Sequence, residues 1–249
     1  MMRTEFLTDD SERSLAPFFS PPLLSATATG LYIVGCVLLL FWPRQELFRF
    51  IGTNSEPLLF FQVFSTAALV QAYLNLRCGR GEMVKQDDLP YFRKEVSTHE
   101  TERNFLRYGL KGFLLHTIFL ILPFLPLLLV ASSISGVSAA VFAEAVSVLW
   151  ITSLLCRVFG FFVYLLWGRL SYAGYLTVRV FGILLLFATA AYSAALNPLL
   201  LLYHMNKGVQ NPLQDSYRIY VAAAACAILL LTVIDNVLVS KNVRTEKTE

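Results

Sequence analysis

Apolar residues are gathered into six long stretches, and short polar segments separate them. The stretches cover residues 23–42, 57–76, 110–131, 139–167, 174–196 and 218–239. A helix rises about 1.5 Å per residue, so about 20 apolar residues are needed to cross the hydrocarbon core of a bilayer. Five stretches have about that length and the fourth is longer. The pattern predicts an all-α integral membrane protein with six transmembrane helices.

Composition supports this class over a soluble domain. Charged residues make up 15% of the chain, whereas soluble domains usually contain about 25%. The mean hydropathy is +0.60. Six spans leave few of the 249 residues for anything else, and no polar segment is large enough for a second folded domain. We therefore expect a single transmembrane domain over 1–249.

The placement of basic residues predicts the orientation of the spans. The longest polar segment contains eight of them: Arg77, Arg80, Lys85, Arg93, Lys94, Arg103, Arg107 and Lys111. The positive-inside rule assigns such a loop to the cytoplasm. Because the spans alternate in direction, both termini then lie in the cytoplasm. Residues 1–22 form a cytoplasmic lead-in that either lies along the inner membrane surface or is disordered.

Prolines and short turns divide the second half of the chain. Pro123 and Pro126 should kink the third span or end it early. The turns at 132–138 and 168–173 are so short that they make consecutive spans antiparallel neighbours. Asn197-Pro198 opens an apolar segment over 198–203, which we expect to form a short helix that re-enters the outer leaflet between spans five and six.

The order of these pieces resembles a known family. The likeness is closest between Glu102 and Pro198, about two-fifths of the chain. It depends on four motifs in sequence: Leu122-Pro123, Gly136-Val137-Ser138, Gly160 and Leu196-Asn197-Pro198. With the large inner loop after span two and the short turns that follow span three, they make the chain similar to the membrane (permease) subunit of type-2 ABC exporters, the ABC-2 type transporter superfamily.

The resemblance implies a permease subunit of an ATP-driven exporter, not an enzyme by itself. ATP and Mg²⁺ would be held by a separate ABC ATPase subunit, since the chain has no glycine-rich phosphate loop. The permease would act as a homodimer or as a heterodimer with a related permease, surrounded by membrane lipids, and would move a lipid, glycan or amphiphilic small molecule. No nucleic acid partner is expected. The short loops and the family likeness place it in the bacterial cytoplasmic (inner) membrane as a multi-pass protein.

A non-transporting scaffold or assembly component that retains the permease fold is the alternative. The N-terminus is short and acidic, whereas family members often begin with a longer basic amphipathic helix. The Glu-x-x-x-Gly-Thr type of stretch that commonly follows span two is also not clear in this sequence. An adjacent ATPase gene would favour transport, and its absence would favour the scaffold.

The inner loop over 77–109 is the candidate coupling loop. In exporters of this type, the corresponding segment forms a helix that contacts the ATPase. Candidate contacts combine apolar anchors with charges: Pro90, Tyr91, Phe92, Arg93, Glu95, Glu100, Glu102 and Arg103. The alternative interpretation is a basic loop that is attracted to anionic lipid.

Arg157 is the most informative ionisable residue within a span. If the apolar centre of span four covers 145–166, Arg157 lies about 14 Å from its inner end. A charge at that depth must face protein or water. It either lines a translocation path and attracts an acidic or phosphate-bearing substrate, or forms a structural ion pair, for which Asp235 in span six is the candidate partner.

The other polar residues give weaker evidence of a functional site. Glu144, near the outer end of span four, is either a solvated interfacial carboxylate or a gate residue. Arg179, near the inner end of span five, is expected to extend its charge toward the membrane surface. The three histidines and four cysteines are too dispersed to predict a catalytic or metal site, and no cofactor is expected in this chain.

Overall fold

The computed structural model describes residues 21–42, 58–76, 113–167, 172–189, 196–206 and 212–246, and within these ranges the chain contains no β-strand. The all-α prediction is therefore confirmed for the described residues. The longer helices are α2 (Pro21–Leu40), α4 (Leu58–Asn75), α7 (Leu125–Ile134), α8 (Ala139–Trp167), α9 (Tyr172–Thr189), α10 (Pro198–Asn206) and α11 (Pro212–Glu246). The lead-in up to residue 20 and the whole of 77–109 lie outside the described residues.

Three helical segments are long and apolar enough to cross a membrane. They are Phe113–Ile134, Ala139–Val163 and Ser216–Asp235. Two further apolar helices, Leu24–Leu40 and Leu176–Thr189, are shorter. The three long segments fall on the predicted spans three, four and six.

The two prolines of the third predicted span change its hydrogen bonding without ending it. The helix over 113–121 tightens into a 3₁₀ turn, η3 (Leu122–Phe124), and continues as α7. Pro123 and Pro126 each lie in the first turn of the segment that follows such a change. Proline is tolerated in a first turn because its missing N–H has no intrahelical partner there. The helix therefore continues to Ile134, beyond the predicted end at 131.

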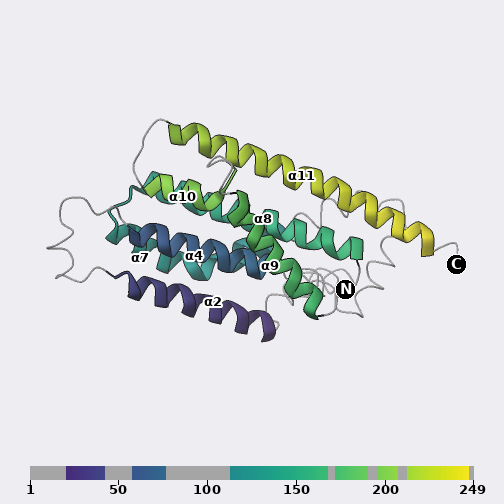
Figure 1. The fold of residues 1–249 in the computed structure, drawn as a ribbon, viewed down its shortest axis with the longest axis horizontal. Helices are drawn as coiled ribbons and strands as arrows, with labels where there is room; N and C mark the ends of the chain where they lie inside the picture. The colour runs from purple at the N-terminus through teal and green to yellow at the C-terminus, as the bar shows by residue number, and fades with distance from the viewer. Residues whose placement is uncertain are drawn as a thin grey trace, which may run out of the picture.

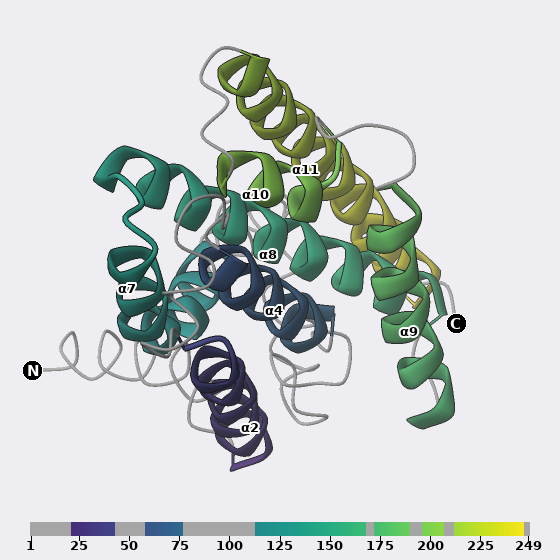
Figure 2. The ribbon, with the colours of Figure 1, turned by 60° about the vertical axis from the view of Figure 1, so that its left-hand side comes forward.

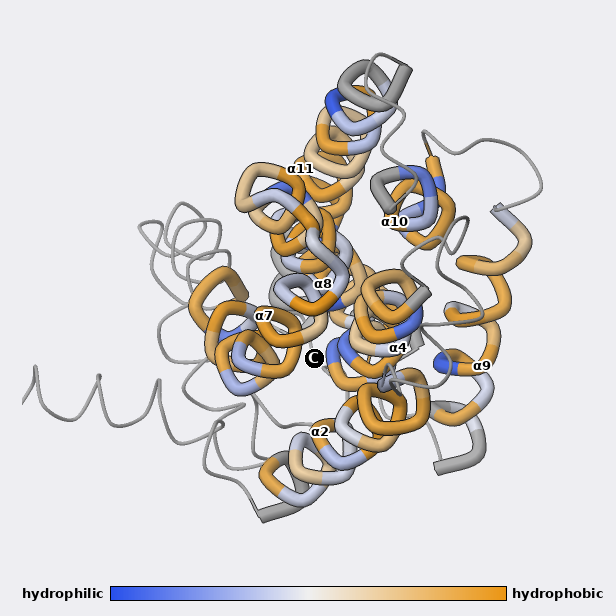
Figure 3. The backbone as a smooth tube through the Cα atoms, turned by 90° about the vertical axis from the view of Figure 1, so that its left-hand side faces the viewer, coloured by the Kyte–Doolittle hydropathy of each residue, from blue (hydrophilic) through white to orange (hydrophobic). Residues whose placement is uncertain are grey.

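The helices form a bundle in which successive long helices alternate in direction (Figure 1). Helix α4 occupies its centre and packs against α2, α7, α8, α9 and α10, as the view along the bundle shows (Figure 3). It can do so because apolar side chains cover its whole circumference, which is typical of a buried helix. Helices α2 and α9 lie at the periphery (Figure 2).

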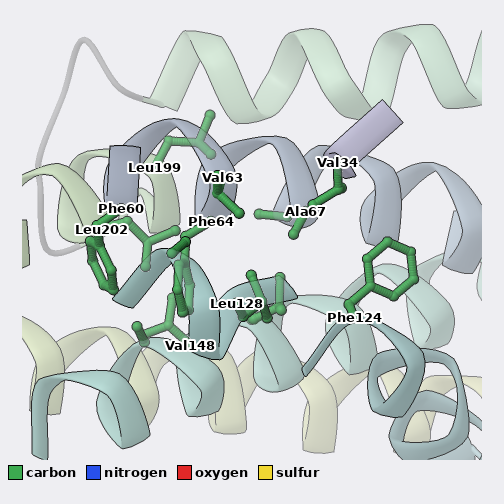
Figure 4. Close-up of a cluster of buried hydrophobic side chains, with 14 of the residues drawn as sticks. Val34, Phe60, Val63, Phe64, Ala67, Phe124, Leu128, Val148, Leu199 and Leu202 are labelled. Carbon is green, nitrogen blue, oxygen red and sulfur yellow. The ribbon is translucent and has the colours of Figure 1, made fainter. Parts of the chain in front are cut away.

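The core is a cluster of apolar side chains between α4 and its neighbours (Figure 4). The Phe60 and Phe64 rings stack along α4 with their centroids 4.4 Å apart. Helix α10 contributes Leu199 and Leu202 to the same cluster, so the short helix after Asn197-Pro198 is confirmed and is part of the core. Packing of this kind supports association between helices even where lipid removes the hydrophobic driving force.

The turn between α7 and α8 has the features expected of its sequence. Gly136 has a φ of 67°, a left-handed conformation that glycine adopts without steric cost. The Val137 N–H donates to the Ser132 carbonyl at 3.1 Å, and the Phe142 N–H donates to the Ser138 carbonyl at 3.0 Å. These bonds satisfy groups at the end of α7 and at the start of α8.

Candidate functional site

Two buried amides lie at the end of the central helix α4. Asn75 is its last residue, and Gln71 is one turn earlier, and neither side chain has exposed surface. The Asn75 Nδ2 donates to the Gln71 carbonyl at 2.8 Å and is 3.3 Å from the Gln71 Oε1. This arrangement leaves the Asn75 Oδ1 available as an acceptor for a residue on another helix.

Arg157 of α8 is that residue. Its Nη1 donates to the Asn75 Oδ1 at 3.1 Å, and only 1% of the Arg157 side chain is exposed. A buried cation is costly unless hydrogen bonds and favourable dipoles surround it. The carbonyl end of a helix carries a partial negative charge, so the end of α4 is a favourable place for a guanidinium.

Gln71 joins the third helical segment to the same group. Its Nε2 donates to the Leu120 carbonyl at 2.8 Å. The 3₁₀ turn η3 begins after its N-cap Ile121 and contains Pro123, which has no N–H to donate. The Gln71 side chain therefore supplies a donor to a carbonyl beside this proline break, as neighbouring helices do at such breaks in membranes.

Arg179 of α9 binds the same end of α4 through Tyr73. Its Nη1 donates to the Tyr73 hydroxyl at 3.0 Å, and its guanidinium carbon lies 4.5 Å from the centroid of the Tyr73 ring. That distance is within the range of cation–π attraction. Arg179 is 6% exposed, so its side chain is buried against α4.

Two glycines allow α8 and α9 to approach α4 closely. A Cβ added to Gly160 would lie 3.2 Å from the Leu76 carbonyl oxygen, and one added to Gly182 would lie 2.8 Å from the Leu76 Cδ1. Leu76 is therefore enclosed between α8 and α9. Together these residues form the α4-end cluster: Gln71, Tyr73, Asn75, Leu76, Arg157, Gly160, Arg179 and Gly182.

Asp235 does not belong to this cluster. The register between α8 and α11 is fixed by hydrogen bonds between the hydroxyls of Ser147 and Tyr217, at 2.7 Å, and of Thr152 and Tyr220, at 2.6 Å. Their offsets of 70 and 68 residues place Asp235 level with residues 165–167 of α8, eight to ten positions beyond Arg157. That separation is about 12–15 Å along the helix axes.

The ion pair considered for Arg157 is therefore replaced by the bond to Asn75. Asp235 is 1% exposed, and its carboxylate oxygens accept no hydrogen bond from the described part of the chain. Arg157 and Asp235 lie on neighbouring helices but at different depths. The offset between α8 and α11 is set by their packing and not by the ends of the spans.

Asn197 organises the opposite end of α9. Its Oδ1 accepts from the N–H groups of Leu199 at 2.9 Å and of Leu200 at 3.0 Å, which makes it the N-cap of α10. Its Nδ2 donates to the Leu186 carbonyl and, at 2.9 Å, to the Thr189 hydroxyl. One buried amide thus connects the end of α9 to the start of α10.

The remaining predicted site residues are not brought together. Glu144 is half-buried in the second turn of α8, at the end of the bundle away from the α4-end cluster. All eight candidate ATPase contacts lie in the segment outside the described residues. Within the described ranges, no group of three His, Cys, Asp or Glu side chains is placed to hold a metal ion.

Arg157 lines neither of two hollows among the described residues. A shallow hollow of about 140 Å³ lies where η3 faces α8, and its lining is apolar: Ile118, Ile121, Leu122, Leu125, Val146 and Trp150. Arg157 does not line it. In this conformation Arg157 holds helices together, and a role along a path would require the cluster to open.

The chain matches no family model, no curated protein and no solved structure. The assignment of function therefore depends on the sequence pattern and on the α4-end cluster. Gln71, Tyr73 and Asn75 were not predicted as site residues, because single uncharged residues in an apolar span give a weaker signal than a charge does. The spacing of Gln71 and Asn75, four apart in an apolar helix, was the signal for a buried polar face.

Proposed function

We propose that this chain is the permease subunit of an ATP-driven exporter of the type-2 ABC class. In this proposal all six apolar segments cross the bacterial inner membrane, and both termini lie in the cytoplasm. Two permeases, identical or related, form the path. A separate ABC ATPase binds ATP and Mg²⁺ and supplies the energy.

The α4-end cluster is the observation that carries the proposal. The chain passes from Leu76 directly into the basic segment 77–109, the candidate coupling loop. Any force that a partner applies to this segment acts first on the end of α4. That end is bonded to α8 through Arg157 and to α9 through Arg179. The arrangement suits a subunit that converts an event at its cytoplasmic loop into movement of its membrane helices.

The exposed surfaces support an amphiphilic cargo. The outward faces of α9 and α11 carry large apolar side chains that are about half exposed: Leu176, Val180, Phe181, Leu184, Leu185, Leu229, Leu230 and Val233. Helix α11 carries no charged residue between Arg218 and Asp235, and α9 carries only Arg179. A lipid, a lipid-linked glycan or a small amphiphile can move along such faces at a lower desolvation cost than a free ion.

A membrane scaffold that retains the fold is the second candidate. The burial of Arg157 inside a bonded cluster favours it, because the residue considered for a path is enclosed between helices. The scaffold would use the same cluster to hold a fixed shape, and it would have no ATPase partner.

The deciding experiment isolates the detergent-solubilised protein from its native membrane. Mass spectrometry identifies the partners, and an ATPase assay measures hydrolysis by the isolated complex. We expect a nucleotide-binding subunit to be recovered, and we expect Glu100→Lys/Glu102→Lys to lower the ATPase rate or release that subunit. Glu246→Lys/Glu249→Lys is the matched control, because it reverses two charges of the same kind in the C-terminal tail.

Each outcome favours one candidate. Recovery of an ATPase whose activity responds to the loop variant and not to the tail variant supports the exporter. Recovery of partners without ATPase activity supports the scaffold. An ATPase that responds equally to both variants would show that the loop is not the contact, and the proposed coupling would be wrong.

A further inference from the structure

We infer that Arg157 and Arg179 are positioning residues that clamp the C-terminal end of α4 between α8 and α9, so that these three helix segments move as one unit. The role in movement rests on the proposed function, while the clamp itself depends only on contacts within this chain. Neither arginine is assigned to contact a cargo or a nucleotide.

The two arginines bind different sides of α4. Their partners Tyr73 and Asn75 are two residues apart, and an α-helix turns about 100° per residue. The two side chains therefore leave α4 about 160° apart by the shorter way around the helix. Arg157 reaches one side from α8, and Arg179 reaches the other from α9. In the view along the bundle, α8 lies on one side of α4 and α9 on the other (Figure 3).

The backbone fits this two-sided grip. Leu76 lies against Gly160 of α8 and against Gly182 of α9: a Cβ at Gly160 would be 3.2 Å from the Leu76 carbonyl oxygen, and a Cβ at Gly182 would be 2.8 Å from the end of the Leu76 side chain. The end of α4 is thus held by steric contact as well as by two charged hydrogen bonds. A displacement of Leu76 must be accompanied by a displacement of both neighbouring helices.

Helix α9 depends on this clamp more than α8 does. Its main packing partner among the described helices is α4, and its polar attachments include the bond from Arg179 to Tyr73 and the bonds from Asn197 near its other end. Several α9 side chains are exposed and apolar, as listed above. Loss of Arg179 therefore removes a polar attachment of α9 to α4.

The clamp is tested first on the chain alone in its membrane. Cysteines are introduced by Leu76→Cys/Gly182→Cys, after the native Cys36, Cys78, Cys156 and Cys226 have been replaced by alanine or serine. The pair is sterically compatible because Leu76→Cys removes the Cδ1 atom that a side chain at position 182 would meet. A short bismaleimide then measures how often the two positions are adjacent.

We expect Arg179→Met to lower the cross-linking rate about fivefold, the factor that corresponds to the loss of one hydrogen bond. Arg179→Lys should give an intermediate rate, since an ammonium keeps the charge but lacks the planar donors of a guanidinium. Arg218→Met is the matched control, because Arg218 is an exposed arginine on α11. An unchanged rate in Arg179→Met overturns the clamp, and size-exclusion chromatography confirms that each variant is folded.

The joint movement is tested in the complex with the ATPase. A fluorophore that is sensitive to its environment is attached at Phe181→Cys, an exposed position of α9, and its emission is compared before and after ATP and vanadate. We expect a response that Arg157→Met and Arg179→Met each reduce severalfold per assembled complex, while Arg218→Met leaves it unchanged. A response of full size in either clamp variant overturns the joint movement. If no ATPase is recovered, the proposed function fails, and the cross-linking result still decides the clamp.

Discussion

Arg157 of α8 donates a hydrogen bond of 3.1 Å to the side-chain oxygen of Asn75 at the end of α4, across 82 residues of sequence. The acceptor is a neutral amide, so the bond does not cancel the charge. The carbonyl end of α4 also favours the cation through its dipole. A helix terminus and an amide thus contribute to stabilising a buried cation for which a carboxylate was one of two alternatives.

Removing only one partner of this bond should be more harmful than removing both. Asn75→Leu removes the Oδ1 that accepts from the buried guanidinium, and hydrogen bonds to charged groups contribute about 1.5–3 kcal/mol. Arg157→Met in the same chain removes the guanidinium that donates this bond. We therefore expect Asn75→Leu/Arg157→Met to be more stable than Asn75→Leu alone, as measured by thermal unfolding in detergent. Gln62→Leu, on the same helix, controls for the loss of an amide. Equal stability of the single and double variants would contradict the assigned contact.

The bond from Gln71 to the Leu120 carbonyl lies beside the break at Pro123, so it should matter more while residue 123 is proline. Gln71→Leu leaves that carbonyl without a donor, which we expect to cost about 1–2 kcal/mol in the free energy of unfolding. Pro123→Ala restores a backbone N–H in the same turn. The effect of Gln71→Leu should therefore be smaller in the Pro123→Ala background, and a double-mutant cycle on thermal stability measures the difference. An effect of the same size in both backgrounds would show that the two sites are independent.

Much of the helical pattern could be predicted from sequence because it depends on local chemistry. Each predicted apolar segment is helical over most of its described residues. The turn at Gly136 and the start of α10 after Asn197 were readable because glycine at positive φ and asparagine followed by proline at a helix start have local physical causes.

The contacts between helices were not predictable in the same way. Arg157 and Asp235 were both recognised as unusual, but their relative depth depends on the offset of α8 and α11, which two hydroxyl bonds set. Tyr73 was missed because an aromatic residue in a span usually contacts lipid or packs in the core. Its bond to Arg179 is evident only when α9 is placed beside α4.

The two functions of the Asn197 amide can be separated. Asn197→Asp keeps an oxygen for the N–H groups of Leu199 and Leu200 but loses the donor to the Leu186 carbonyl. Asn197→Ala loses both. Loss of an N-cap costs about 1 kcal/mol, so Asn197→Ala should speed amide exchange at Leu199 and Leu200 about fivefold. Asn197→Asp should leave that exchange nearly unchanged and should loosen the end of α9. Hydrogen–deuterium exchange with mass spectrometry measures both regions, and identical profiles for the two variants would contradict the division of roles.

The close approach of α8 to α4 predicts opposite effects of one substitution at two glycines. A Cβ at Gly160 would lie 3.2 Å from the Leu76 carbonyl oxygen and 3.4 Å from the Asn75 carbonyl oxygen, whereas a Cβ at Gly35 of α2 would meet no atom within 4 Å. In a helix interior, alanine is favoured over glycine by about 0.5–1 kcal/mol. We expect Gly35→Ala to raise the unfolding temperature, because the free energy of unfolding increases by about that amount.

At Gly160 the backbone that must yield is held by Arg157, so overpacking should cost about 1–3 kcal/mol in the free energy of unfolding and exceed the gain from alanine. Gly160→Ala should therefore lower the unfolding temperature in detergent, and it should lower it less when Arg157→Met has already released the end of α4. A rise in stability for Gly160→Ala comparable to that for Gly35→Ala would mean that α8 and α4 are not in close contact at this point.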